Sequence, residues 1–260
     1  MNGVNKTLYI PLYGKSFVSK KGIILRDEYA ERIWERESFP LKAKSKSKWL
    51  AYYMAMRAAV FDEWTRETVT SNSIVLHLGC GMDSRAFRVT TQATAWIDVD
   101  FPSVIDERKR YFNETETYRM LAADLRDVSF VAALPKAERA VALMEGVSMY
   151  LTNSELQALL SSLNTYYPNL SVLVDCYTPF AAKMSKIKNP VNDVGVRQVY
   201  GVANSAVLET DTGLTFVRER ELTPVRLIDE LSGAEKRVFK WLYAGKTAGK
   251  LYKLYEYRSR

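Results

Sequence analysis

Four acidic residues stand at the ends of short apolar runs. The run that ends WIDVD supplies Asp98 and Asp100, and the runs that end LAAD and LME supply Asp124 and Glu145. Because the carboxyl ends of parallel strands meet at one edge of a sheet, we expect these carboxylates to line one site. Carboxylates collected in this way accept hydrogen bonds and favour a ligand that carries positive charge.

A glycine pair follows the first apolar run, in SIVLHLGCGMDS. Gly79 and Gly81 allow a sharp turn with positive φ and leave room for a ligand against the backbone. A dinucleotide fingerprint would need a third glycine where Ser84 stands. Asp83, just before it, would compete with a phosphate for the positive end of the following helix. The loop therefore predicts a ligand without phosphate and counts against NAD.

The spacing of the acids suggests a nucleoside. Asp98 and Asp100 follow Gly79 by 19 and 21 residues, the distance at which a strand-end acid meets ribose hydroxyls, and Asp124 is placed to reach an adenine amino group. S-adenosylmethionine combines these groups with a sulfonium, an ammonium and one carboxylate, which Arg57 is suited to bind. We therefore predict S-adenosylmethionine as the cofactor. The alternative is that each acid only caps a helix and that Arg57 is a solvated helix residue.

An obvious general base is missing. The single histidine, His77, lies inside an apolar run and is expected to be a core residue, and Cys80 has no histidine partner. Tyr150, Tyr177 and Tyr200 are the candidate catalytic residues, although each could equally be a packing residue. No metal-ligand spacing is present, so no metal is expected. A carboxylate acceptor is already ionised and needs no base, which favours it over a hydroxyl.

The elements that must position these residues form three zones. Residues 25–69 have helical periodicity, residues 73–177 alternate apolar runs with amphipathic stretches, and the signals weaken after residue 178. Apolar strands separated by helices predict a doubly wound, Rossmann-like sheet of the α/β class. We expect seven mostly parallel strands with an antiparallel C-terminal strand. Residues 1–70 would form a helical N-terminal extension, and residues 71–260 the main domain with an inserted cap at about 178–207.

Composition sets broad limits on partners and location. The chain of 260 residues has a net charge of +7, and its densest basic cluster, LKAKSKSKWL, lacks the interleaved aromatics of a nucleic-acid module. We expect a solvated face there and no nucleic-acid partner. No apolar run is long enough to span a membrane, and the N-terminus lacks a secretory pattern. With two isolated cysteines, the simplest expectation is a reduced, cytoplasmic protein.

Four segments together resemble the leucine carboxyl methyltransferase family, including the tetracenomycin-type polyketide O-methyltransferases. They are LHLGCGMDSRAFRV, WIDVDFPSVIDERKR, MLAADLRD and LMEGVSMYLT, and the likeness covers roughly residues 48–168. The resemblance implies a class I methyltransferase fold and a mobile lid within residues 3–21. It also implies that acceptor choice is made after Tyr177, where the similarity fades.

The resemblance also implies roles for individual residues in binding the cofactor. Arg57 would bind its carboxylate, and Gly79 and Gly81 would face the methionyl part. Asp100 would hold the ribose and Glu145 would approach the ammonium group. The adenine would meet Asp124 and Leu125. We also expect Asp83 and Asp98 at the cofactor site. Asp98 stands where many members have glutamate, so its role stays open.

The expected function is therefore S-adenosylmethionine-dependent methyl transfer to a carboxyl or hydroxyl oxygen of a small, polyketide-like metabolite. A protein C-terminal carboxylate is the alternative acceptor, and a non-catalytic protein that binds S-adenosylmethionine is the alternative class. A nucleic-acid methyltransferase is disfavoured because EGVSMY stands where an N/D-P-P-[YF] motif would be expected. The oligomeric state and the pathway are left open.

Overall fold

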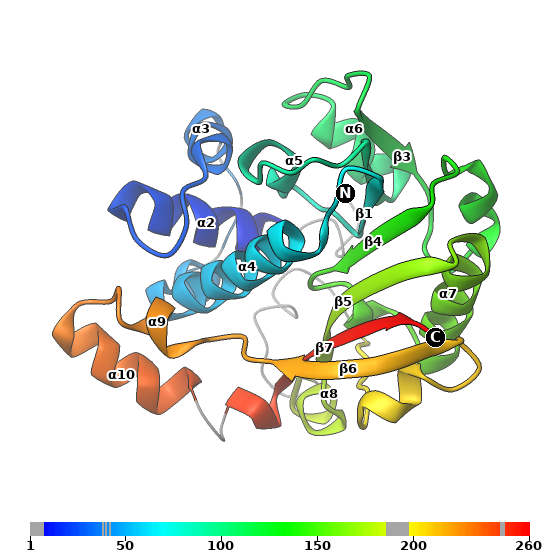
Figure 1. The fold of residues 1–260 in the computed structure, drawn as a ribbon. Coiled ribbons are helices and arrows are strands. Elements are labelled where there is room, and N and C mark those ends of the chain that lie inside the picture. The colour runs from blue at the N-terminus through cyan, green and yellow to red at the C-terminus, as the bar shows by residue number, and fades with distance from the viewer. Residues whose placement is uncertain (1–7, 38, 40, 42, 186–197, 245–247) are drawn as a thin grey trace.

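A seven-stranded sheet forms the centre of the molecule (Figure 1). The computed structural model describes residues 8–37, 39, 41, 43–185, 198–244 and 248–260. Within this part of the chain the strand order is β3-β2-β1-β4-β5-β7-β6. β1 to β5 are parallel, and β7 is antiparallel to both β5 and β6, which confirms the predicted fold class. The strands are β1 Ser73–Leu78, β2 Ala95–Asp100, β3 Tyr118–Ala122, β4 Arg139–Met144, β5 Asn169–Tyr177, β6 Leu214–Arg220 and β7 Tyr252–Ser259.

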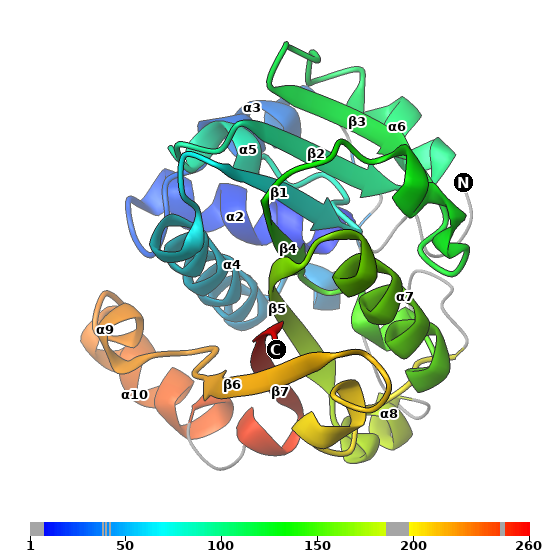
Figure 2. The same cartoon turned by 45° about the vertical axis from the view of Figure 1, so that its right-hand side comes forward.

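Helices cover both faces of the sheet. Figure 2 shows α2, α3 and α4 on one side and α7 on the other. The α-helices are α2 Tyr9–Lys21, α3 Glu28–Arg36, α4 Lys48–Thr68, α5 Arg85–Arg88, α6 Pro102–Arg108, α7 Asn153–Tyr166, α8 Pro179–Ser185, α9 Val225–Ile228 and α10 Gly233–Tyr243. The short 3-10 helices are η1 Ala43–Lys46, η2 Val128–Ala133, η3 Ser148–Tyr150, η5 Ser205–Leu208 and η6 Ala248–Lys250.

The apolar strands are buried on both faces because their side chains alternate between two core clusters. In β1, Val75 packs with α2 and α4, whereas Ile74, Leu76 and Leu78 pack with α7. Every residue of β1 is buried. Because both faces of the sheet are covered, both sets of alternating side chains are apolar, and the run is continuously apolar as is typical of parallel sheets.

The first helix, α2, lies within the helical extension expected for residues 1–70 but before residue 25, where the helical periodicity begins. It contains Pro11 and Gly14, two residue types that usually argue against a helix. Pro11 lies in the first turn, where its missing N–H would be unpaired in any case. A Cβ on Gly14 would lie 3.2 Å from the carbonyl oxygen of Ala51 in α4, so glycine lets the two helices approach closely. Tertiary packing therefore outweighs the local signals.

The predicted cap is described only in part. Within 178–207 the structure has α8, an extended segment and η5, while residues 186–197 lie outside the described residues. The extended segment is attached to the sheet end, since Tyr200 N donates to Met149 O at 2.8 Å and Val202 N to Tyr177 O at 2.8 Å. The division of the chain at residue 70 stays a prediction. One hydrophobic cluster joins α2 and α4 to β1, β4 and β5 across that boundary.

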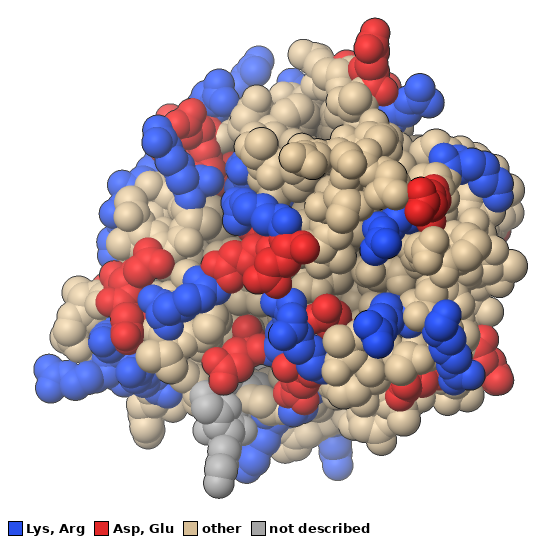
Figure 3. Space-filling view, in the orientation of Figure 1, with Lys and Arg blue, Asp and Glu red and all other residues tan. Residues whose placement is uncertain are grey.

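The positive net charge is not gathered into one patch on the face shown in Figure 3. There, Lys and Arg side chains alternate with Asp and Glu. In the basic stretch 41–50, Lys48 pairs with Glu235 at 2.9 Å and Lys46 lies over the ring of Trp34. Both contacts fit the expected solvated face. None of the described helices is both long and apolar enough to cross a membrane.

Candidate active site

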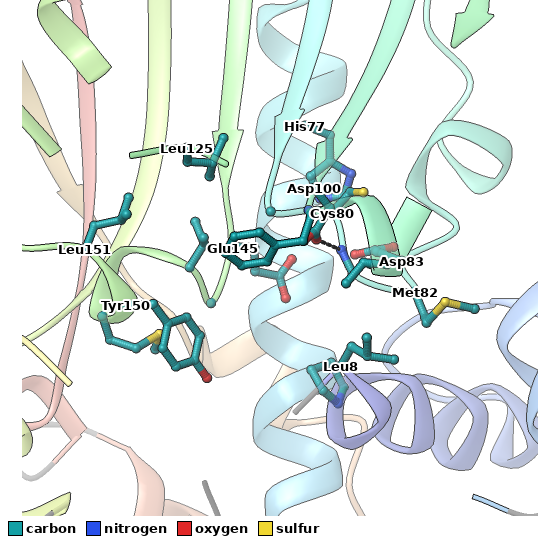
Figure 4. A pocket seen from close by; sticks show the side chains of 18 of the residues that line it. Leu8, His77, Cys80, Met82, Asp83, Asp100, Leu125, Glu145, Tyr150 and Leu151 are labelled. Carbon is teal, nitrogen blue, oxygen red and sulfur yellow. Dashed lines mark hydrogen bonds between the residues drawn. The ribbon is translucent and has the colours of Figure 1, made fainter. Parts of the chain in front are cut away.

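A cavity of about 590 Å³ opens at the carboxyl ends of β1 to β5. Figure 4 shows Glu145 between Tyr150 on one side and Asp83 on the other, with Leu8 of the N-terminal segment nearby. Most of the predicted cofactor residues line it: Arg57, Gly79, Gly81, Asp83, Asp100, Asp124, Leu125 and Glu145. The sheet therefore brings together side chains from four strand ends and from α4.

The glycine loop has the backbone that its sequence predicts. Gly79 has a φ of 70° and Gly81 a φ of 51°, both in the left-handed region. A Cβ on Gly79 would lie 2.6 Å from Val147 Cγ2, so the loop after β4 closes directly over this position. Glycine is required here for two reasons, the positive φ and the close approach.

Replacing Gly79 by alanine is expected to lower the free energy of unfolding by roughly 2–5 kcal/mol. The left-handed φ costs an L-residue about 1–2 kcal/mol, and overpacking against Val147 adds about 1–3 kcal/mol. Gly22 is the matched control, because it has a φ of 68° and nothing within 4 Å of a built Cβ. Gly22→Ala should show the backbone cost alone. Urea denaturation of both variants measures the difference, and equal losses would rule out the contact with Val147.

Asp100 accepts hydrogen bonds from the backbone around the glycine loop and can accept further hydrogen bonds from a ligand. Its Oδ2 accepts from Gly81 N at 2.8 Å and its Oδ1 from Phe101 N at 2.7 Å. Each carboxylate oxygen can accept a second hydrogen bond. Burial raises the pKa of Asp100, and the two backbone donors offset this only in part. Because no cation is paired with it among the described residues, Asp100 is suited to vicinal hydroxyls such as those of a ribose.

Asp83 forms ion pairs with basic side chains of the protein and is therefore not free to bind a ligand. It pairs with Lys15 of α2 at 3.0 Å and with Arg85 at 3.3 Å, and Arg88 is a third partner. These cations hold its pKa well below the usual range despite burial. Lys15 is only 2% exposed and also lines the cavity, although the sequence analysis did not select it. Asp83 thus ties the N-terminal helix to the glycine loop.

Arg57 lies between two buried carboxylates. Its Nε donates to Glu145 Oε1 at 3.1 Å and its Nη1 to Asp175 Oδ2 at 2.8 Å. Burial raises the pKa of Glu145, but Arg85 and Arg57 outweigh it and lower that pKa to about 2. Arg85 is fully buried and forms ion pairs with Asp62 and Glu145.

Asp175 is a functional candidate that was missed. It stands in the fifth apolar run, LSVLVDCY, where the strand-end pattern already used for the other acids would have found it. Gly146 N donates to its Oδ1 at 2.7 Å, and the side chain is fully buried. It orients Arg57 without lining the cavity.

Asp124 and Leu125 lie together at the β3 end of the cavity. Asp124 is paired with Arg126, whose guanidinium donates to both carboxylate oxygens, and this hydrogen bonding lowers the pKa of Asp124. The carboxylate is about one-third exposed, and Leu125 is buried. A polar group beside an apolar wall suits a flat heterocycle with an amino group.

Asp98 does not line the cavity, contrary to its place among the predicted cofactor residues. It is fully buried one pleat below Asp100 and bonds Arg108, Tyr118 Oη at 2.7 Å and Trp96 Nε1 at 2.9 Å. Burial opposes its ionisation, but Arg108 in particular lowers its pKa. The structure assigns it to the support of β2 and α6. His77, with Nδ1 3.2 Å from Asp98 Oδ1, is part of the same buried group.

The candidate tyrosines separate into two groups. Tyr150 and Tyr177 line the cavity, whereas Tyr200 does not. Tyr252 of β7 lines it as well, and its ring meets that of Tyr177 edge to face at 4.5 Å. Cys80 is buried, and burial raises the pKa of its thiol well above the usual value, which opposes a nucleophilic role. In the described parts of the chain, no cluster of three or more metal-ligating side chains occurs.

Comparison with known proteins identifies the family. The family model described as leucine carboxyl methyltransferase matches residues 5–164, which is more than half of the chain. The tetracenomycin polyketide synthesis O-methyltransferase TcmP of Streptomyces glaucescens is 28% identical over 94% of this chain and 91% of its own. The S-adenosyl-L-methionine-dependent methyltransferase dpfgK of Gibberella zeae is 27% identical over 66% of this chain and 64% of its own.

Solved structures confirm the fold at low sequence identity. The magnesium protoporphyrin IX methyltransferase ChlM of Synechocystis PCC 6803 superposes with a TM-score of 0.53 at 13% identity, covering 98% of this chain and all of that one. A methyltransferase described as putative from Thermobifida fusca YX gives 0.55 at 12% identity, covering 95% and 94%. The family match together with this fold leads to one conclusion: the chain belongs to the leucine carboxyl methyltransferase family and is an S-adenosylmethionine-dependent methyltransferase.

Proposed function

We propose that the protein transfers the methyl group of S-adenosylmethionine to an oxygen of a small, polyketide-like acceptor, with a carboxylate as the first choice. The observation that carries the proposal is the ring of acids at successive strand ends around one cavity, with Arg57 among them. The similarity to TcmP, whose name places it in polyketide synthesis, supports the acceptor class.

The described residues fit this cofactor. Asp100 has acceptor capacity for two hydroxyl groups, and the positive φ of Gly79 and Gly81 keeps side chains away from the loop. Glu145 faces the cavity with its pKa lowered to about 2, so it is available as an anion for an ammonium group. Arg57 would pair with a carboxylate. The fit rests on polar groups that line the cavity in the same order along the sheet as the adenine, ribose and methionyl parts of the cofactor follow one another.

The chain contributes binding and exclusion of water rather than proton transfer. When bound, S-adenosylmethionine would supply an electrophilic methyl group that an oxygen nucleophile attacks at carbon, with S-adenosylhomocysteine as the leaving group. Leu8, Ile10 and Pro11 of the N-terminal segment line the cavity with apolar side chains, which would help to exclude water from the reacting groups. Alignment of this kind contributes several kcal/mol to lowering a barrier. Arg57 and Glu145 would fix the charged end of the cofactor.

The identity of the acceptor and the occurrence of turnover are part of this proposal. A protein C-terminal carboxylate stays the alternative acceptor, and cofactor binding without turnover the alternative class. We also propose that no nucleic acid is bound. The cytoplasmic location stays a prediction from the sequence.

The test is calorimetric titration of the protein with S-adenosylmethionine, S-adenosylhomocysteine and NAD, followed by a screen of acceptors with carboxylic acids first. We expect micromolar binding of the two adenosyl ligands, no binding of NAD, and methyl ester formation detected by mass spectrometry. Binding without turnover across acids, phenols and peptides with a free C-terminus would favour the non-catalytic alternative. Binding of NAD alone would contradict the proposal.

A further inference from the structure

The cavity divides into two parts along the sheet. The acids Asp83, Asp100, Asp124 and Glu145 belong to the ends of β1, β2, β3 and β4, while Tyr177 and Tyr252 belong to β5 and β7. Neighbouring strands are about 4.8 Å apart, so β7 lies roughly 10 Å from β4 and farther still from β1. A nucleoside held by the acids leaves the β5–β7 side for the second substrate. We call these the acidic part and the tyrosine part.

The tyrosine part is apolar apart from its hydroxyl groups. Met149 and Tyr150 line it together with the edge-to-face pair of Tyr177 and Tyr252, and these four residues belong to one apolar cluster. Methionine sulfur and tyrosine rings make favourable contacts with flat aromatic groups. Among the cations that line the cavity within the described residues, Lys15 and Arg126 are paired with carboxylates, and Arg57 is assigned by the proposed function to the carboxylate of the cofactor. Recognition of a polar group here therefore depends on hydroxyls.

The Tyr252 hydroxyl is distinguished from the others by its surroundings. In the parts of the chain that the structure describes, no hydrogen bond is formed by this hydroxyl, although the residue lines the cavity. The antiparallel register places Tyr252 opposite Tyr177, and Tyr53 of α4 packs behind it with ring centroids 5.7 Å apart. The ring is thus held from two sides. A hydroxyl with no protein partner at a cavity wall is free to bond a ligand or water.

We infer that Tyr252 binds the methyl acceptor, and that its hydroxyl donates a hydrogen bond to the carboxylate of a planar, aromatic acid. This inference rests on the proposed function and adds to it the residue and the acceptor chemistry. Burial raises the pKa of Tyr252 well above 10, and the neighbouring Tyr177 and Tyr53 raise it further, so the hydroxyl stays protonated and acts as a donor. Tyr252 is therefore a positioning residue and not a general base.

The chemistry balances without a proton acceptor. A lone pair of the acceptor carboxylate forms the new oxygen–carbon bond, the carbon–sulfur bond breaks, and its electron pair stays on sulfur. The carboxylate carries no proton, so none is transferred, and Tyr252 keeps its own. The single histidine of the chain, His77, does line the cavity, but it is buried with its Nδ1 3.2 Å from Asp98 Oδ1.

The test compares the wild type with Tyr252→Phe and with Tyr255→Phe as the matched control. Tyr255 lies on the same strand, is buried on the opposite face and does not line the cavity. The probes are 2-naphthoic acid, 2-naphthol and cyclohexanecarboxylic acid, with methyl transfer followed by mass spectrometry and S-adenosylhomocysteine binding by calorimetry. Loss of one hydrogen bond to a charged group should lower kcat/KM for 2-naphthoate about 10- to 100-fold in Tyr252→Phe. Binding of S-adenosylhomocysteine should change less than twofold.

Each outcome of this test either supports or overturns the inference. The inference is supported if Tyr255→Phe matches the wild type, if 2-naphthoate is the preferred probe, and if the pH profile of Tyr252→Phe keeps the wild-type shape. It is overturned if Tyr252→Phe keeps a kcat/KM within twofold of the wild type, or if its pH profile loses an ionisation. It is also overturned if the wild type prefers 2-naphthol or the saturated acid, or transfers a methyl group to none of the probes. Weakened S-adenosylhomocysteine binding in Tyr252→Phe would assign the residue to the cofactor instead. Failure of the wild type to bind S-adenosylhomocysteine would reject the proposed function itself.

Discussion

Asp100→Ala is expected to weaken binding of S-adenosylmethionine by at least about 100-fold while the protein stays folded. The carboxylate is placed to accept hydrogen bonds from two hydroxyl groups, and bonds to a charged acceptor contribute roughly 1.5–3 kcal/mol each. The variant also leaves Gly81 N and Phe101 N without their side-chain acceptor, which loosens the glycine loop. Calorimetric titration measures the loss, and circular dichroism checks the fold.

Two controls and a pH series make this result specific. Asp100→Asn keeps one acceptor oxygen and should bind with intermediate affinity. Asp124→Ala removes a partly exposed carboxylate already paired with Arg126, so a loss of less than about tenfold is expected. Because burial raises the pKa of Asp100, wild-type affinity should fall as the pH decreases, starting at a higher pH than for an exposed aspartate. Unchanged affinity in Asp100→Ala would remove this residue from the cofactor site.

Asp98→Ala is expected to lower the free energy of unfolding by about 3–5 kcal/mol, without a specific effect on the cofactor. Asp98 and Arg108 are both fully buried, and removal of one partner leaves an uncompensated charge in the core. Tyr118 and Trp96 lose their hydrogen-bond acceptor as well. Urea denaturation measures the loss.

The double variant Asp98→Ala/Arg108→Met is the control, because it removes both charges. It should recover part of the stability, and the coupling follows from the double-mutant cycle. Arg108 lowers the pKa of Asp98 in the folded protein, so the stabilisation is present above the unfolded pKa of about 3.9. It should be lost as the pH falls through the lower, folded pKa. A variant with wild-type stability and impaired cofactor binding would return Asp98 to the cofactor site.

Asp98 and Asp100 have the same signals in the sequence but different environments in the structure. Both are strand-end acids on the same face of β2, since they are two residues apart, and both have a spacing from Gly79 that suits a ribose. Two residues along a strand correspond to roughly 6.6 Å. That distance puts Asp100 at the rim and Asp98 beneath it, within reach of Arg108. Only the packing of α6 against the sheet decides this difference.

Local patterns predicted most of the fold, because they depend on neighbours along the chain. The apolar runs of residues 73–177 became the strands β1 to β5, and Thr152 and Glu155 form a capping box at the start of α7. The helix α2 was not located within the predicted helical extension, since Pro11 and Gly14 argue against a helix locally and Gly14 is explained only by its close contact with α4. The same holds for Lys15, whose burial depends on Asp83 from another element.

The amino-acid sequence by itself determined the fold class, the glycine loop, the family and the acids that meet at one edge of the sheet. Period-two and helical periodicities, glycine at a turn, and motif spacing are properties of short segments, so they can be read without the third dimension. The tertiary structure alone decided which acids face the cavity and which are buried in ion pairs. It also brought Asp175 to Arg57 and Tyr252 to Tyr177, pairs separated by 118 and 75 residues, because such contacts depend on strand order rather than on spacing.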